Sequence, residues 1–353
     1  MDALVSASRG RSLLLSGNSA AMNSQTILSF RAIVGCAVLL LGSGASATAA
    51  DLLSPSEPLL LKGTKGGFDF ITVDAARRRL LAAHTGNNSL DVIDLDQSQL
   101  IKSVPTGAAQ DCVVSSKGDA YLVSVSKPPQ LAIVDPEKLS LTGTVALNGP
   151  ADLLAVSPTG NAYVAHDDGK DLWVINAAEK KVVATIELPS EAPEDLVFSA
   201  DGKHLFQAMK TASKIEVIDS HTNKIVHSWP TAPAAGPHGI AAVPAFGTLL
   251  IAGGNGKLAL MSQMDGKVLA TADIPERVDQ IAYDAEKGRV YCASSTGKLA
   301  IYNVEKNKLT KAGEVQTSQG AKSVALDPKT HAVWVAYAKG DSSYVQKFSP
   351  ASE

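Results

Sequence analysis

Seven near-equal repeats constrain this chain more than any other feature of its sequence. The third copy reads ADLLAVSPTGNAYVAHD over residues 151–167, and the same order of apolar and turn residues returns six more times. The residues that open the copies, here called the anchors, are 41, 42 or 43 positions apart. This regular period indicates one repeated structural unit and not a series of unrelated domains. The anchors are Asp69, Asp111, Asp152, Asp195, His238, Asp279 and Lys322.

Each copy contains four short strand patterns. In the third copy they occupy residues 153–156, 162–165, 172–175 and 182–188, and Gly, Pro, Asn and Asp separate them. Short apolar runs bounded by such turn residues predict β-strands. No amphipathic helical pattern persists between residues 51 and 353. Four antiparallel strands in each 41- to 43-residue copy match the length of a propeller blade.

The two ends of the repeat array complement each other. The seventh copy runs through residues 343–348 and lacks a fourth strand, while a strand pattern at 58–62 precedes the first copy. An open array would leave two sheet edges unpaired. The sequence therefore predicts an all-β fold: one seven-bladed β-propeller over 51–353, with four-stranded antiparallel blades, closed by the N-terminal strand.

One part of the repeat resembles a known family. Residues 163–166 (YVAH), with 153–158 before them and 172–176 after them, resemble the YVTN-type β-propeller repeat. The whole arrangement over 57–350 resembles the exported, YncE-like seven-bladed propellers and, more distantly, the lactonase-type propellers. Residues 205–208 and 249–252 keep only the apolar character of the motif. The resemblance implies a WD40-like architecture and, loosely, a binding role, because propellers carry many functions.

The N-terminal region predicts export. In residues 22–50, Arg31 precedes a ten-residue apolar core at 32–41, and small residues then offer a cleavage site after residue 49 or 50. Such a core is too short to cross roughly 30 Å of hydrocarbon as a permanent helix. We expect a signal peptide at 22–50, an upstream extension at 1–21 that leaves Met1 or Met22 as the start, and a periplasmic or secreted protein without a transmembrane span. Cys36 follows a lipoprotein-like box, but the apolar run continues beyond it, so no lipid is expected there.

Charge and cysteine content limit the classes of partner and the disulfide bonds that the chain can be expected to have. The chain has 32 Lys and Arg against 35 Asp and Glu, a formal charge of −3. Without residues 1–50, which hold three arginines and one aspartate, the charge becomes −5. This balance disfavours nucleic acid as a partner. Cys112 and Cys292 are expected to be buried and unpaired. The expected protein is a monomer that binds an unidentified protein partner or small ligand.

The anchors predict a ligand-binding site at one mouth of the central channel. In a propeller the innermost strands begin at one rim, and the loops between second and third strands open on the same face. Crowded carboxylates there would raise one another's pKa or attract a cation. A residue that recurs in five blades also suits a structural role, since Asp caps backbone N–H groups. Both roles remain open, and the cofactor is unknown, with a weakly bound divalent cation as the candidate.

Three histidines extend this hypothesis to a metal site. His84 and His166 end second strands, and His238 is itself an anchor. Imidazoles beside carboxylates suit Zn²⁺, Cu²⁺ or Ni²⁺, but the three belong to non-adjacent copies, so exposed loop positions are the alternative.

The sequence contains few residue patterns that indicate catalysis. No G-x-S-x-G, H-E-x-x-H or C-x-x-C motif occurs, and no catalytic residue is assigned. A non-catalytic binding or interaction module that uses the channel-mouth face is the favoured function. The alternative is a lactonase-like hydrolase with its site at the same mouth. The resemblance to lactonase-type propellers implies a His/Glu/Arg set, for which His238, Glu194 and Arg277 are the nearest candidates.

Overall fold

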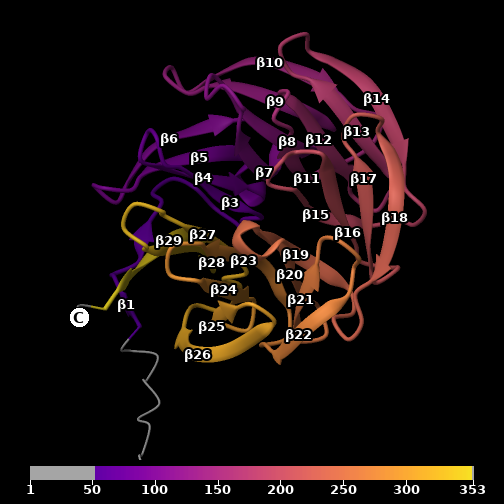
Figure 1. Cartoon of the computed structure of the whole chain (residues 1–353). Coiled ribbons are helices and arrows are strands. Elements are labelled where there is room, and N and C mark those ends of the chain that lie inside the picture. Colours follow the sequence, from indigo (N-terminus) through magenta and orange to yellow (C-terminus); the bar gives the residue numbers. More distant parts are fainter. Residues whose placement is uncertain (1–51, 352–353) are drawn as a thin grey trace, which may run out of the picture. The chain divides into compact units, whose positions relative to one another are not determined.

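The computed structural model describes residues 52–351. The predicted upstream extension at 1–21, the signal peptide at 22–50 and Cys36 lie outside the described residues, so the export hypothesis remains a prediction. Within 52–351 the chain forms seven antiparallel sheets arranged as a ring (Figure 1). The predicted seven-bladed β-propeller is confirmed.

Blades 1 to 3 follow the chain from the channel outward, each as a four-stranded sheet. Blade 1 contains β3 (Ile71–Asp74), β4 (Arg79–His84), β5 (Ser89–Asp94) and β6 (Gln99–Pro105). Blade 2 contains β7 (Ala108–Val114), β8 (Tyr121–Lys127), β9 (Gln130–Asp135) and β10 (Ser140–Ala146). Blade 3 contains β11 (Ala151–Val156), β12 (Asn161–His166), β13 (Asp171–Asn176) and β14 (Lys181–Glu187).

Blades 4 to 6 repeat the same order. Blade 4 contains β15 (Pro193–Phe198), β16 (His204–Met209), β17 (Lys214–Asp219) and β18 (Lys224–Pro230). Blade 5 contains β19 (Pro237–Val243), β20 (Thr248–Gly253), β21 (Lys257–Ser262) and β22 (Val268–Asp273). Blade 6 contains β23 (Val278–Asp284), β24 (Arg289–Ser294), β25 (Lys298–Glu305) and β26 (Lys308–Gln316).

Blade 7 combines the two ends of the described chain. Its strands β27 (Ser323–Leu326), β28 (Val333–Lys339) and β29 (Ser342–Pro350) come from the last repeat, and β1 (Leu53–Pro55) and β2 (Leu59–Leu60) come from the N-terminal segment. Short 3-10 turns, η2 (Thr85–Asn87) and η3 (Pro244–Phe246), are the helical segments that the structure assigns within 52–351. Neither is long and apolar enough to cross a membrane.

The hydrophobic core lies between neighbouring blades. Tyr163 and Leu172 of blade 3, for example, pack in one cluster with Leu196 and Leu205 of blade 4. The middle strands are apolar on consecutive residues because a blade covers each of their faces. The outermost strands alternate, so that Val183 on β14 is 47% exposed. Cys112 and Cys292 are buried and free, as predicted.

Ring closure takes place on β29. Leu59 pairs with Val345, Leu60 pairs with Tyr344, and the Leu61 N–H donates to the Ser343 carbonyl at 2.9 Å. The predicted N-terminal closing strand is therefore confirmed. The structure adds β1, which continues the pairing along β29 from Leu53 to Pro55.

Side chains reinforce the seam between blades 7 and 1. The Arg78 guanidinium donates to both carboxylate oxygens of Asp327, at 2.5 and 2.7 Å, and also pairs with Asp96. The basic cluster at 77–79 therefore contributes an ion pair between blade 1 and blade 7. A bidentate pair of this kind adds geometric specificity to the closure.

Leu61 and Leu60 offer a matched test of the closure. Leu61 is fully buried, whereas Leu60 is 40% exposed. Leu61→Ala should lower the free energy of unfolding by about 2–5 kcal/mol, because it leaves a cavity in the seam. Leu60→Ala should change it by no more than about 0.5 kcal/mol. Urea denaturation of both variants measures the difference, and equal costs would contradict a buried closing segment.

Candidate functional site

β-Bulges place polar side chains at the channel mouth. In blades 3 to 6 the innermost strand carries two residues opposite one residue of the second strand. A bulge of this type bends the strand and redirects a side chain. The bulged pairs are Asp152 and Leu153, Glu194 and Asp195, His238 and Gly239, and Asp279 and Gln280.

The first residue of each pair lines one small cavity, here called the mouth cavity. Its volume is about 180 Å³, and every blade contributes one residue at this level. Asp167 and Lys210 reach it from the loops after β12 and β16, so these loops open on the expected face. The seven blade residues are Asp69, Gln110, Asp152, Glu194, His238, Asp279 and Lys322.

The mouth cavity contains five of the seven anchors. In blades 2 and 4 the neighbouring residues Gln110 and Glu194 take the places expected for Asp111 and Asp195. One signal in the sequence could have revealed this offset. The turn glycines Gly118, Gly160 and Gly202 are 42 residues apart, and counting back from them aligns Gln110, Asp152 and Glu194.

Asp111 and Asp195 instead tie adjacent blades together. Asp111 accepts hydrogen bonds from the N–H groups of Cys112 (2.7 Å) and Leu154 (3.2 Å). Asp195 accepts them from Leu196 and Ile240, both at 2.8 Å. In each case the second donor belongs to the next blade. These two carboxylates therefore have the capping role, one of the two roles that the sequence left open.

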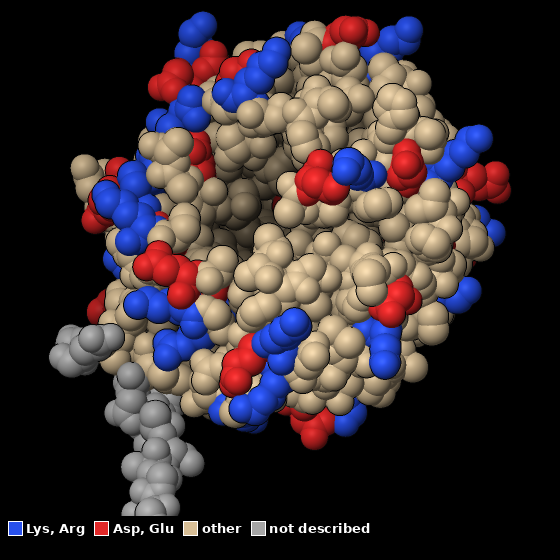
Figure 2. All heavy atoms as spheres, in the orientation of Figure 1, with Lys and Arg blue, Asp and Glu red and all other residues tan. Residues whose placement is uncertain are grey.

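Below the mouth cavity the channel widens and becomes apolar. A cavity of about 490 Å³ is lined mainly by aliphatic residues and Phe198, with Asp111 and Asp195 among the few polar groups. The Gln280 side chain links blade 6 to blades 7 and 1 near this level. Its Oε1 accepts hydrogen bonds from Val324 N–H (2.9 Å) and Ile71 N–H (3.2 Å). Figure 2 shows a central hollow in the face that it presents, lined largely by uncharged residues, with Lys, Arg, Asp and Glu around it.

The electrostatics of the mouth cavity are dominated by acids. Five carboxyl groups line it, from Asp69, Asp152, Asp167, Glu194 and Asp279, against two ammonium groups. Lys322 Nζ lies 2.6 Å from Asp279 Oδ2 and 2.9 Å from Asp69 Oδ1. Lys210 Nζ lies 2.7 Å from Glu194 Oε1. Among residues 52–351, no lysine or arginine forms an ion pair with Asp152.

Burial and mutual repulsion shift the pKa values of these groups. Burial raises the pKa of Asp69 to about 6, although Lys322 opposes the shift. Burial, followed by the charges of Asp69 and Glu194, raises the pKa of Asp152 well above its usual range. Burial also raises the pKa of Glu194. Burial lowers the pKa of Lys322, but the carboxylates of Asp69 and Asp279 outweigh it and the net shift is upward.

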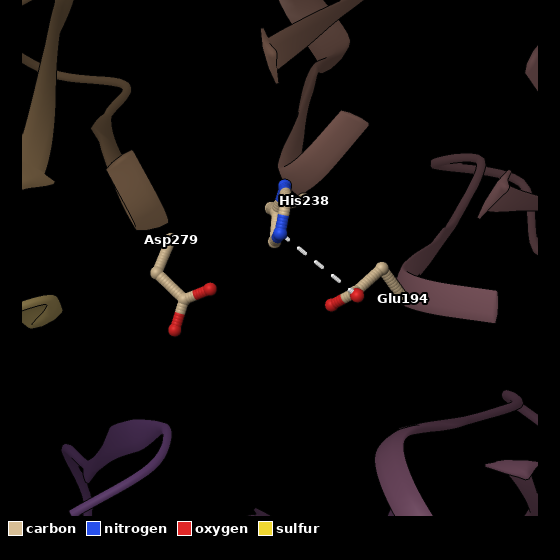
Figure 3. A group of neighbouring side chains, drawn as sticks. All are labelled: Glu194, His238 and Asp279. Atoms are coloured by element: carbon tan, nitrogen blue, oxygen red, sulfur yellow. Dashed lines mark ion pairs between the residues drawn. The ribbon is translucent and has the colours of Figure 1, made fainter. Parts of the chain in front are cut away.

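Three side chains in the mouth cavity have the composition of a metal-ligand set. Glu194, His238 and Asp279 each offer a ligand atom, and these atoms all lie within 4.8 Å of one another. They extend from β15, β19 and β23, the inner strands of three consecutive blades, and point toward a common space (Figure 3). The His238 Nδ1 lies 2.8 Å from the Gly236 carbonyl oxygen, and its Nε2 lies 3.9 Å from Glu194 Oε1.

The other two histidines of the predicted metal set do not line this cavity. His84 is fully buried, with Nδ1 2.7 Å from Asp91 Oδ2 and Nε2 3.0 Å from Ser343 Oγ. This Asp–His–Ser order matches that of a hydrolase triad, but all three residues are fully buried. The group therefore joins blade 1 to β29 and offers no access to a substrate.

His166 is held beside the mouth by close packing. Its ring lies 4.8 Å from that of Trp173, and its Nδ1 lies 3.6 Å from Asp171 Oδ2. A Cβ atom at Gly149 or Gly169 would come within 2.0 or 2.2 Å of the imidazole, so both positions require glycine. The three imidazoles do not converge, and His238 has two carboxylates as its neighbours instead.

Comparisons with known proteins agree on the architecture. The family model described as "Cytochrome D1 heme domain" matches residues 60–246. The "uncharacterized protein YncE" of Salmonella typhi and that of Salmonella typhimurium are each 27% identical over 176 residues, which is 49% of this chain. The match spans 44% of the length of these relatives, under half. The predicted resemblance to the YncE-like group is confirmed.

Solved structures show the same fold. A streptogramin B lyase superposes with a TM-score of 0.72 at 16% identity, covering 86% of this chain and 100% of the lyase. The hydrazine synthase of Kuenenia stuttgartiensis gives 0.70 at 16% identity, covering 78% of this chain and 95% of the other. At such identities the likeness concerns the fold alone.

The buried carboxyl of Asp111 predicts an unusual pH dependence. Burial raises the pKa of Asp111 to about 7. The folded state therefore holds this proton more tightly than the unfolded chain, so its stabilising contribution is present at pH 4 and is lost as the pH rises through 7. Asp111→Asn cannot ionise, so its stability relative to the wild type should improve from pH 4 to pH 8. Urea denaturation at five pH values tests this, and a constant difference would contradict the raised pKa.

Proposed function

This chain belongs to the cytochrome D1 heme domain family, and on that premise we propose that it is a non-catalytic binding propeller whose mouth cavity holds a cation or a cationic group. The observation that carries the proposal is the excess of acids in one small space: five carboxyl groups against two ammonium groups in about 180 Å³. Low-dielectric walls focus such a field and raise the local concentration of cations. The proposed ligand is a free cation, a cationic small molecule or a cationic group on a protein partner.

The residues present do not fit the heme that the family description names. A cavity for a ligand of that size is mostly apolar and roughly 300–1,000 Å³, whereas the mouth cavity is smaller and acidic. The larger channel cavity is apolar, but no His, Cys, Met or Tyr lines it to serve as an axial ligand. No step of the proposed function therefore involves heme.

Asp152 is the residue of the mouth most in need of a counterion. Its pKa is raised by burial and by neighbouring acids, and neither lysine of the cavity lies within ion-pair distance of it. A bound cation would stabilise the ionised form, so binding should release a proton wherever this carboxyl is protonated beforehand. The carboxyl groups of the mouth cavity supply negative charge, and Lys210 and Lys322 neutralise part of it in the free protein.

A hydrolase is the second candidate, because one observation favours it. His238 also lines an adjoining cavity of about 270 Å³ together with Arg277, and Glu194 lies beside it at 3.9 Å. A base and a cationic group, two of the groups that hydrolysis of a lactone would require, therefore line one accessible space, and the Glu194 carboxylate lies next to the base in the mouth cavity. We also propose, from the sequence pattern alone, that the protein is exported.

Cation binding predicts a ligand-dependent melting temperature. Ca²⁺, or an alkylammonium ion as the organic probe, should raise the melting temperature of chelator-treated protein, since a ligand at 100 times its Kd stabilises by about 2.7 kcal/mol. Asp152→Asn should reduce this shift by at least half. Asp273→Asn, at a carboxylate that is 83% exposed, is the matched control and should keep it. Calorimetry that detects no shift with either probe would overturn the proposal.

A panel of lactones separates the two candidate functions. The binding module should show no hydrolysis above the buffer rate, and His238→Ala should leave that result unchanged. Turnover by the wild type that is lost in His238→Ala would favour the hydrolase over the binding module, because it would make His238 part of a catalytic set. A proton-release assay over a range of lactone ring sizes is a sufficient measurement.

A further inference from the structure

We propose that Glu194, His238 and Asp279 form a binding site for one divalent transition-metal ion of the Zn²⁺, Co²⁺ and Ni²⁺ class, and that the ion displaces Lys210 and Lys322 from two of these carboxylates. The inference rests on the proposed function, because it names the ligand of the same cavity and the residues that hold it. The three side chains come from consecutive blades, and their ligand atoms lie within 4.8 Å of one another (Figure 3).

His238 is oriented as a metal ligand would be. The Gly236 carbonyl oxygen, 2.8 Å from Nδ1, can only accept a hydrogen bond, so Nδ1 carries the proton of the neutral ring. Nε2 is then left with its lone pair. Metal-binding histidines regularly donate their second nitrogen to a carbonyl or carboxylate in this way, which fixes the tautomer and the ring orientation. The ring of His238 is thus already held for a ligand at Nε2.

The lone pair of His238 faces another acceptor. Glu194 Oε1 lies 3.9 Å from Nε2, too far for a hydrogen bond between the two. Two acceptors that face each other across such a gap are stabilised by a shared cation. A metal ion about 2.0–2.2 Å from each donor bridges at most about 4.4 Å. The observed separation falls within that span, and a small side-chain rotation of Asp279 would complete the set.

The mixture of donors selects the class of ion. Ca²⁺ prefers six to eight oxygen ligands, whereas imidazole nitrogen favours Zn²⁺, Ni²⁺ and related ions. Three protein ligands also leave at least one coordination position open toward the mouth cavity. That position is where water or a donor atom of a partner molecule would bind.

Lys210 and Lys322 form ion pairs with two of the three ligand side chains in the free protein. Lys210 Nζ lies 2.7 Å from Glu194, and Lys322 Nζ lies 2.6 Å from Asp279. Lys210 can release Glu194 easily, because its side chain is 45% exposed. Lys322 keeps a second partner, Asp69, at 2.9 Å when Asp279 turns to the metal. Each ammonium group therefore competes with the ion and weakens its binding.

Co²⁺ titration of the chelator-treated chain tests the site directly. The wild type should bind one equivalent with a visible d–d spectrum that reports nitrogen and oxygen donors. His238→Gln should weaken binding by about tenfold or more. His221→Gln, at an exposed histidine in the β17–β18 turn, is the matched control and should bind as the wild type does. Lys210→Met should bind more tightly, because one competing charge is gone.

The possible failures are distinguishable. Equal Co²⁺ affinity and spectrum in His238→Gln would overturn the metal site, while Ca²⁺ or alkylammonium stabilisation that depends on Asp152 would leave the proposed function standing. Absence of a shift with any cation would overturn both. Weaker binding by Lys210→Met would overturn the displacement. Should His238→Gln fail to fold, Glu194→Gln replaces it, and unchanged Co²⁺ binding there would again contradict the site.

Discussion

Pairing of the N-terminal segment with β29 is the constraint on which the rest of this molecule depends. Blades bury their apolar residues against neighbouring blades, so each sheet needs a neighbour on both sides. A ring meets this need for all seven only if the last sheet contacts the first. β1 and β2 supply the missing strand of blade 7, and the Arg78–Asp327 pair and the buried group of His84, Asp91 and Ser343 tie the same seam.

The closed ring creates the site by bringing one position of the repeat together seven times. At a strand start in an open sheet, Asp69, Asp152, Glu194 and Asp279 would be separate, solvated residues. Around a narrow channel they share one small cavity, where desolvation and repulsion raise the pKa of Asp69, Asp152 and Glu194. Lys210 and Lys322 relieve part of this repulsion. The remaining negative charge is the property on which the proposed binding of a cation rests.

The same repeat position divides into two roles according to the bulge. The first residue of a bulged pair faces the mouth cavity, and the second can turn to the backbone of the next blade, as Asp195 does toward Ile240. Carboxylates that cap the backbone of the next blade and carboxylates that line the mouth cavity are therefore adjacent in sequence. This division is consistent with a family that is described by a heme domain and includes a chain whose mouth cavity is small and acidic, since the blades determine the fold and the bulged residues determine which side chains line the cavity.

The repeat period, the turn residues and the unmatched strands at the two ends determined the architecture, because each strand and turn is specified by local sequence and the period counts the blades. The sequence also determined that Asp69, Asp152, His238, Asp279 and Lys322 meet at one mouth. The tertiary structure decided which of two adjacent residues faces the channel, since a bulge shifts the register by one residue. The pattern of apolar positions does not record that shift, although the spacing of the turn glycines does in blades 2 to 4. For the same reason the tertiary structure replaced Asp111 and Asp195 with Gln110 and Glu194. It also separated His84 and His166 from His238, because His84 is buried against Asp91 and Ser343 and His166 packs against Trp173.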